Sequence, residues 1–146
     1  MELHRVEAVA PGLAARIAGA EPASARTFAF RVARLACAVA GVHDANALEV
    51  ARGGLERYPE IAELVQLWDL ERELDAACDD RLEAATVARS LQELQQPSEC
   101  VEARAVGAVI AALTPDAREA ARGATYEALT AGCDGRALEA LADELF

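Results

Sequence analysis

Apolar side chains recur every three or four residues along most of this 146-residue chain. This spacing is the periodicity of an amphipathic α-helix, because it places the apolar positions on one side of the helix. Between residues 24 and 41 the apolar positions form two sides, which predicts a central helix contacted from both. The two sides comprise Phe28, Val32, Leu35 and Val39, and Phe30, Ala33, Cys37 and Ala40.

Proline, glycine and short polar residues divide the rest of the sequence into further helix-length segments. Ser, Thr and Asp are typical helix N-caps, proline fits the first turn, and glycine often follows the last turn. N-caps are predicted at Ser24, Asp44, Ser98 and Thr114, and the last helix is predicted to start at Asp134. Helices are predicted over about 11–20, 24–41, 44–58, 60–79, 80–95, 98–113, 115–132 and 134–146. This pattern predicts one all-α domain, residues 1–146, of seven or eight packed helices arranged as antiparallel hairpins.

The segment from 60 to 95 contains the longest apolar stripe, and it can be interpreted in two ways. The stripe includes Ile61, Leu64, Val65, Trp68, Leu74, Ala84, Ala88 and Leu91. Asp80 and Glu83 have the form of a capping box, and Arg81 interrupts the stripe. We therefore predict a break at Asp80, with a single helix over 60–95 as the alternative. Trp68 is expected to pack in the core.

A shift of 70 residues aligns residues 32–57 with 102–127 without a gap, and nine of 26 positions match. Both segments contain the pattern A-x-E-x-A-R-G, which ends at Gly53 and at Gly123. Such a repeat would give two copies of a three- to four-helix unit of about 70 residues, with the two glycines as equivalent points of close helix approach. The alternative is chance, because four of the nine matches are alanine. The two copies would be residues 10–79 and 80–146.

The composition of the chain favours an all-helical protein and excludes some classes of partner. The chain has 36 alanines and only 4% aromatic residues, which favours closely packed helices over strands. Its 14 basic residues are all arginine and are outnumbered by 25 Asp and Glu, for a net charge of -11. An acidic chain binds phosphate backbones poorly, so no nucleic-acid partner is expected. No apolar run approaches the ~20 residues that span a bilayer, so no membrane contact is expected either.

The four cysteines, at positions 37, 78, 100 and 133, lack the C-x-x-C spacing and neighbouring histidines of a zinc site. Each lies in or beside an Ala-rich helical stretch. They are therefore predicted to be reduced thiols that pack as small apolar side chains. Residues 1–10 lack the apolar run of a secretory signal, so we expect a cytoplasmic protein. No cofactor is predicted, because no phosphate-binding glycine loop or dinucleotide-binding motif is present.

Negative charge is concentrated in residues 58–103, which contain 12 carboxylates and three arginines, a net charge of -9. Three of the carboxylates recur every four residues, and like charges at that spacing repel one another on a helix. An acidic surface that retains this repulsion can attract a basic protein by electrostatic steering. The alternative is a solvated helix face with no partner. The predicted partner-binding residues are Asp69, Glu71, Asp75, Asp79, Asp80 and Glu83.

Two other functions compete with a protein-interaction module. Glu60 and Glu63, followed by Asp75 and Asp79, resemble part of the acidic pattern of helical Mg-dependent nucleotide pyrophosphatases, but the downstream Glu-x-x-Asp of that pattern is missing. One acidic helix also cannot surround a hard cation, so no metal site is predicted. No catalytic residues are predicted, because no nucleophile or phosphate-loop motif is present. A homo-oligomer that pairs residues 1–57, of net charge +1, with the acidic segment is the remaining alternative.

The stretch Ala47-Leu48-Glu49-Val50-Ala51-Arg52-Gly53, preceded by an Ala-rich helix, resembles Ala-rich all-helical immunity proteins of bacterial toxin systems. The resemblance covers about 30 residues twice over and rests on Ala, Glu and Arg positions. It implies a non-enzymatic inhibitor or adaptor whose acidic surface occludes the active site of a basic toxin. No individual site residue can be transferred from that family.

Overall fold

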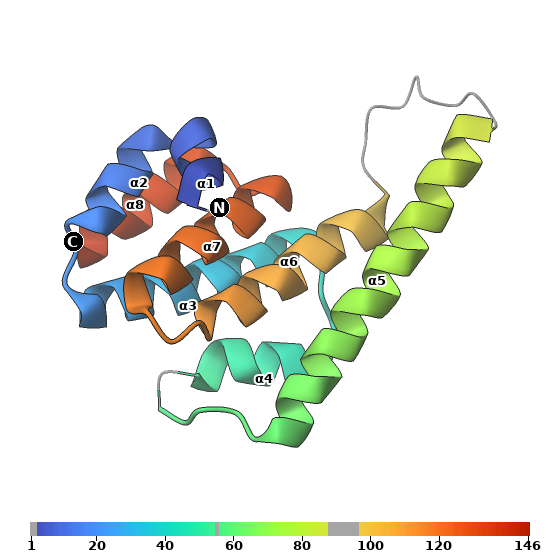
Figure 1. Ribbon diagram of the computed structural model, residues 1–146, viewed down its shortest axis with the longest axis horizontal. Coiled ribbons are helices and arrows are strands. Elements are labelled where there is room, and N and C mark those ends of the chain that lie inside the picture. Colours follow the sequence, from blue (N-terminus) through green and yellow to red (C-terminus); the bar gives the residue numbers. More distant parts are fainter. Residues whose placement is uncertain (1–2, 55, 88–96) are drawn as a thin grey trace.

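The computed structural model describes residues 3–54, 56–87 and 97–146. Within these ranges the chain forms eight α-helices and no strand, as Figure 1 shows. The helices are α1 (Leu3–Val9), α2 (Pro11–Ala18), α3 (Pro22–Ala40), α4 (Ala45–Gly53), α5 (Ile61–Val87), α6 (Ser98–Ala112), α7 (Ala117–Thr130) and α8 (Gly135–Leu145). The prediction of an all-α protein of seven or eight packed helices is confirmed.

Aspartate side chains cap three of the helices. The carboxylates of Asp44 and Asp134 each accept a hydrogen bond from a first-turn amide, at 2.9 and 3.0 Å. The predicted N-cap at Asp44 is therefore confirmed. The predicted cap at Thr114 is wrong. Asp116 caps α7 instead, because its carboxylate accepts bonds from two amides of the first turn.

Two other predicted N-caps are wrong. Helix α3 begins before Ser24, because Pro22 occupies its first turn, where the missing N–H of proline has no consequence. Ser98 is the first residue of α6 and makes no capping bond, while Pro97 stands at the N-cap position. At the end of α3, Gly41 has a φ of 73°, the left-handed conformation in which glycine often terminates helices.

Helices α3, α6 and α7 pack against one another at the centre of the fold (Figure 1). Small side chains allow helix axes to approach closely, and alanine supplies much of this central contact. The fully buried alanines of the three helices include Ala33, Ala36, Ala105, Ala108, Ala120, Ala121, Ala124 and Ala128. The prediction that α3 is a central helix is therefore confirmed, although Val39, near its end, is 51% exposed.

The remaining helices surround this centre. Figure 1 shows α1, α2 and α8 on one side of the central helices and α4 and α5 on the other. Leu13 and Ile17 of α2 and Leu138 of α8 fill the space towards the centre. The sequence pattern did not predict α1, because the buried Val6 alone establishes no periodicity.

The longest helix, α5, is continuous over Ile61–Val87, so the predicted break at Asp80 is wrong. Asp80 and Arg81 are exposed within the helix, and Arg81 pairs with Glu99 at 3.5 Å, so neither side chain has to enter the core. Residues 88–95, including Ala88 and Leu91, lie outside the described residues. No helix within the described ranges is long and apolar enough to cross a membrane.

The two glycines of the suggested repeat occupy different environments. A Cβ atom on Gly123 would lie 3.1 Å from the Cβ of Ala111, so this glycine does mark a close approach between α7 and α6. A Cβ atom on Gly53 would meet no atom within 4 Å. The expectation that both glycines mark equivalent close approaches is therefore wrong, and the repeat itself stays a prediction.

Candidate functional site

Helix α5 is attached to the rest of the fold mainly along one side. Leu67 is fully buried there, and Leu64 and Leu74 are partly buried against the core. Helix α5 packs against α6, which runs roughly antiparallel to it in Figure 1. Trp68 lies about 100° further round the helix than Leu67 and is 50% exposed, so the prediction that it packs in the core is wrong.

Arg104 of α6 joins α5 to α7 through its two terminal nitrogens. Nη2 donates a hydrogen bond to Oδ1 of Asp75 on α5 at 2.6 Å, and Nη1 donates one to Oε2 of Glu127 on α7 at 3.1 Å. The Arg104 side chain is 32% exposed, so these pairs are better shielded from solvent than surface ion pairs are. Asp75 therefore holds the helices together, in addition to any contact it makes with a partner.

Glu71 completes this cluster from the side of α5 that faces α6. Its Oε2 atom would lie 2.8 Å from a Cβ on Gly107, and Oε2 of Glu127 would lie 3.2 Å from the same Cβ. Glycine at 107 thus leaves room for two carboxylates beside Arg104. Burial raises the pKa of Glu71, while the positive charge of Arg104 opposes that rise. The cluster lines a cavity of about 430 Å³ between α5, α6 and α7.

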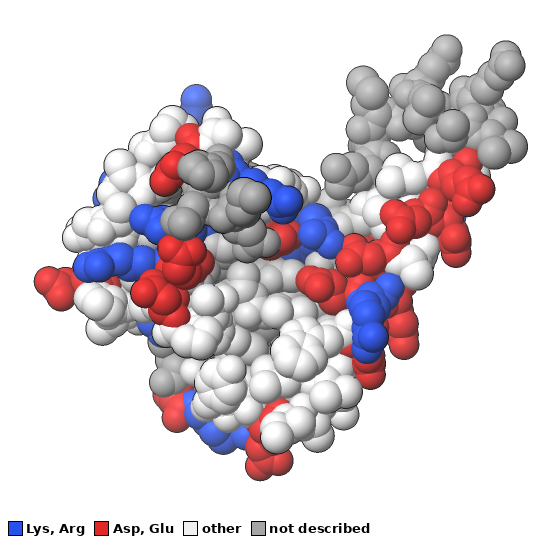
Figure 2. Space-filling model, in the orientation of Figure 1, with Lys and Arg blue, Asp and Glu red and all other residues white. Residues whose placement is uncertain are grey.

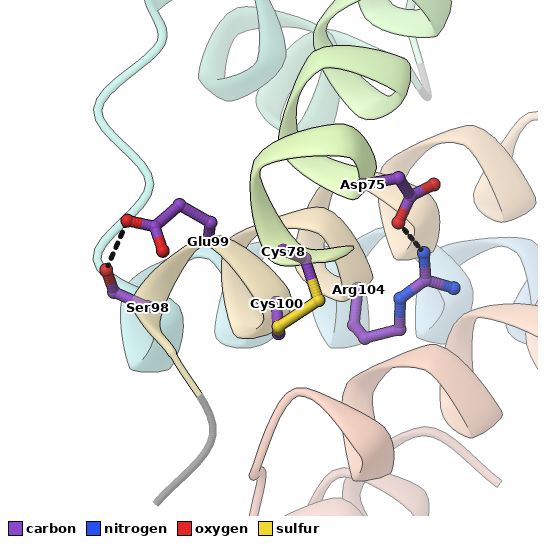
Figure 3. Close-up of a disulfide and its surroundings, with 6 residues drawn as sticks. All are labelled: Asp75, Cys78, Ser98, Glu99, Cys100 and Arg104. Carbon is purple, nitrogen blue, oxygen red and sulfur yellow. Dashed lines mark hydrogen bonds and ion pairs between the residues drawn. A yellow bond between two sulfur atoms is a disulfide. The ribbon is translucent and has the colours of Figure 1, made fainter. Parts of the chain in front are cut away.

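A disulfide between Cys78 and Cys100 joins the same two helices one turn further along. Figure 3 shows Asp75 and Cys78 on α5 facing Arg104 and Cys100 on α6. The Cα atoms of the two cysteines are 4.7 Å apart. The prediction that all four cysteines are reduced is therefore wrong. The two cysteines are brought together because α5 and α6 pack side by side. Their separation of 22 residues in the sequence does not by itself indicate a disulfide.

The other two cysteines are buried thiols, as predicted. Cys37 and Cys133 are free, and both lie in the interior. Burial raises the pKa of Cys37 to about 12, so this thiol stays protonated near neutral pH and is a poor nucleophile. Burial also raises the pKa of Cys133. Neither residue is suited to thiolate chemistry.

The six predicted partner-binding residues divide into two groups. Asp69 pairs with Arg72, Asp75 pairs with Arg104, and Glu71 is half-buried beside Arg104. The second group consists of Asp79, Asp80 and Glu83, which are exposed and pair with no arginine in the described part of the chain. Figure 2 shows carboxylates along the part of α5 that projects from the fold. Only three of the six predicted residues therefore have unpaired charges within the described part of the chain, and all three lie in the second half of α5.

The carboxylates of the metal-enzyme alternative do not converge from two helices. Glu60, Glu63, Asp75 and Asp79, the residues of the metal-enzyme alternative, lie on or just before a single helix. Glu63 is engaged by Arg57 in a bond at 3.0 Å, which lowers its pKa. Among the described residues, no three His, Cys, Asp or Glu side chains form a group suited to a metal ion.

Replacement of Arg104 tests the cluster. We expect Arg104→Met to lower the free energy of unfolding by about 2 kcal/mol, because Asp75 and the half-buried Glu71 then lose the positive charge of Arg104. Adding Glu71→Gln should recover part of that loss by removing one of the charges. Urea denaturation at neutral pH measures both variants. Arg72→Met is the matched control: it removes an exposed ion pair and should cost at most about 0.5 kcal/mol. Equal losses from the two arginine variants would contradict the assignment.

Removal of the disulfide should destabilise the fold. Cys78→Ala with Cys100→Ala opens a loop closed across 22 residues, which should lower the free energy of unfolding by about 3 kcal/mol. A thiol reductant should bring the wild-type protein to the same stability and leave the double variant unchanged. If the reductant has no effect on the unfolding midpoint of the wild-type protein, the disulfide does not stabilise the α5–α6 hairpin.

Comparison with known proteins assigns the chain to no group. No family model, no curated protein and no solved structure matches this chain. The resemblance to immunity proteins therefore stays a prediction. The function has to be inferred from the geometry of the chain's own residues.

Proposed function

We propose that this chain is a non-enzymatic interaction module whose helix α5 docks a basic protein partner, acting as an inhibitor of the immunity type or as an adaptor. The observation that supports this most directly is the group Asp79, Asp80 and Glu83. The three carboxylates are exposed and unpaired within the described part of the chain. Carboxylates in this state create a negative potential that attracts cations and accelerates the encounter with a basic surface.

The position of these residues adds to the proposal. They follow Cys78, at which the disulfide fixes α5 to α6, so the helix presents them from an anchored base. A rigid helix loses little conformational entropy when it binds, which favours affinity. The disulfide does not favour the predicted cytoplasmic location, because disulfides persist in oxidising compartments and are rare in the cytosol. That location stays a prediction.

Neutralisation of the three carboxylates tests this function. The wild-type chain is used to isolate a binding protein, and the dissociation constant is then measured with both proteins purified, at low and at high salt. We expect the triple variant Asp79→Asn, Asp80→Asn and Glu83→Gln to raise Kd about tenfold, since each exposed pair contributes up to ~1 kcal/mol. Its affinity should also depend less on salt.

The matched control removes three exposed carboxylates elsewhere. Glu7→Gln, Glu21→Gln and Glu56→Gln change the net charge by the same amount, and all three positions lie outside α5. The control should leave Kd within about twofold of the wild-type value, because screening weakens charges that lie far from the contact. An unchanged Kd in the α5 variant, or equal losses in both variants, would contradict the proposal.

A further inference from the structure

The first two turns of α5 expose large apolar side chains on one side of the helix. Ile61 is 80% exposed, Val65 43% and Trp68 50%. Their spacing of four and three residues places all three on the same side of the helix. That side is different from the one that holds Leu67 against α6. Single exposed apolar residues are common, but three in a row along one helix are typical of a contact surface.

The same side of α5 continues into the acidic half of the helix. Further steps of three or four residues from Trp68 reach Arg72, Asp75, Asp79 and Glu83. Arg72 and Asp75 are neutralised by partners within the protein. The unpaired charges on this side are therefore those of Asp79 and Glu83. One continuous side of α5 thus has an apolar first half and an acidic second half.

We propose that this side of α5 binds an amphipathic helix of a partner protein, with apolar side chains packed on Ile61, Val65 and Trp68 and basic side chains paired with Asp79 and Glu83. This inference rests on the proposed function and specifies the chemistry of the partner. Charge complementarity favours this occupant over a second copy of the chain, because a copy of net charge -11 would bring its own carboxylates to the contact.

The geometry of α5 fixes the spacing that the partner needs. At 1.5 Å per residue, the stripe from Ile61 to Glu83 is about 33 Å long, and Val65 lies about 24 Å from the midpoint between Asp79 and Glu83. A partner helix of about 22 residues therefore covers the stripe, with the centres of its apolar and basic blocks about 16 residues apart on one face. Apolar anchors then supply much of the affinity, and the charges determine orientation and the rate of association.

A synthetic peptide tests the pairing directly. The probe is a helical peptide of about 22 residues with three leucines at spacings of four and three in one half and three arginines on the same face of the other half. Two control peptides replace either the arginines by glutamine or the leucines by alanine. Trp68 is the only tryptophan of the chain, so its fluorescence reports contact with the stripe. We expect a blue shift with the full peptide and binding at least tenfold weaker with either control.

Variants of the chain locate the contact. Val65→Ser should weaken binding of the full peptide about tenfold or more. Val39→Ser, at a position of α3 that is 51% exposed, should leave binding unchanged. The peptide without leucine could bind as tightly as the full peptide and leave the emission of Trp68 unshifted. That result would contradict the proposed apolar contact with α5 but not the proposed function. If the triple variant Asp79→Asn, Asp80→Asn and Glu83→Gln binds the full peptide with unchanged affinity, the proposed function itself is contradicted.

Two further outcomes would overturn the inference. One is that no peptide of the set binds the wild-type chain. The other is that the wild-type chain alone sediments as a dimer and Val65→Ser makes it monomeric, because a second copy would then occupy the stripe. We expect the wild-type chain and Val65→Ser to sediment alike as monomers at micromolar concentration.

Discussion

The arrangement of this protein depends on how α5 is fixed to α6. The seam between them contains the buried Leu67, the pair of Asp75 with Arg104, and the disulfide of Cys78 with Cys100. Each contact lies about one or two turns beyond the last; Leu67 and Cys78 lie on one side of α5, and Asp75 lies at the border between this side and the side of Trp68. Because a helix of 27 residues is held along this one side, its other sides remain available to solvent or to another protein.

This attachment divides the acidic residues of α5 between two roles. Glu71 and Asp75 surround Arg104, and Gly107 leaves room for them, so their charge is used inside the protein. Beyond Cys78 the carboxylates of α5 are exposed and pair with no arginine in the described part of the chain. From Ile61 to Trp68 the exposed side is apolar. We therefore expect partner binding to depend on the apolar first turns and the acidic second half of α5, rather than on the net charge of the protein.

The sequence predicts those features that depend on neighbours along the chain. The cap at Asp44, the start of the last helix near Asp134 and the two apolar sides of α3 are of this kind. Contacts between distant segments were not predictable from pattern alone. Nothing local distinguishes Cys78 and Cys100 from the buried thiols, and Arg104 gathers carboxylates from two other helices. The prediction of a cap at Asp80 is wrong because Asp and Glu three residues apart can also lie on the exposed surface of a continuous helix. The same residues at the same spacing start a helix elsewhere.

The most direct measurement of the central claim is amide hydrogen exchange of the oxidised chain, with and without the amphipathic basic peptide. The account predicts that the peptide slows exchange in residues 61–84 of α5 and leaves α3, α7 and α8 unchanged, because binding hinders local opening only where the partner helix lies. Slower exchange in the central helices, or in α8, with no change in α5 would contradict it.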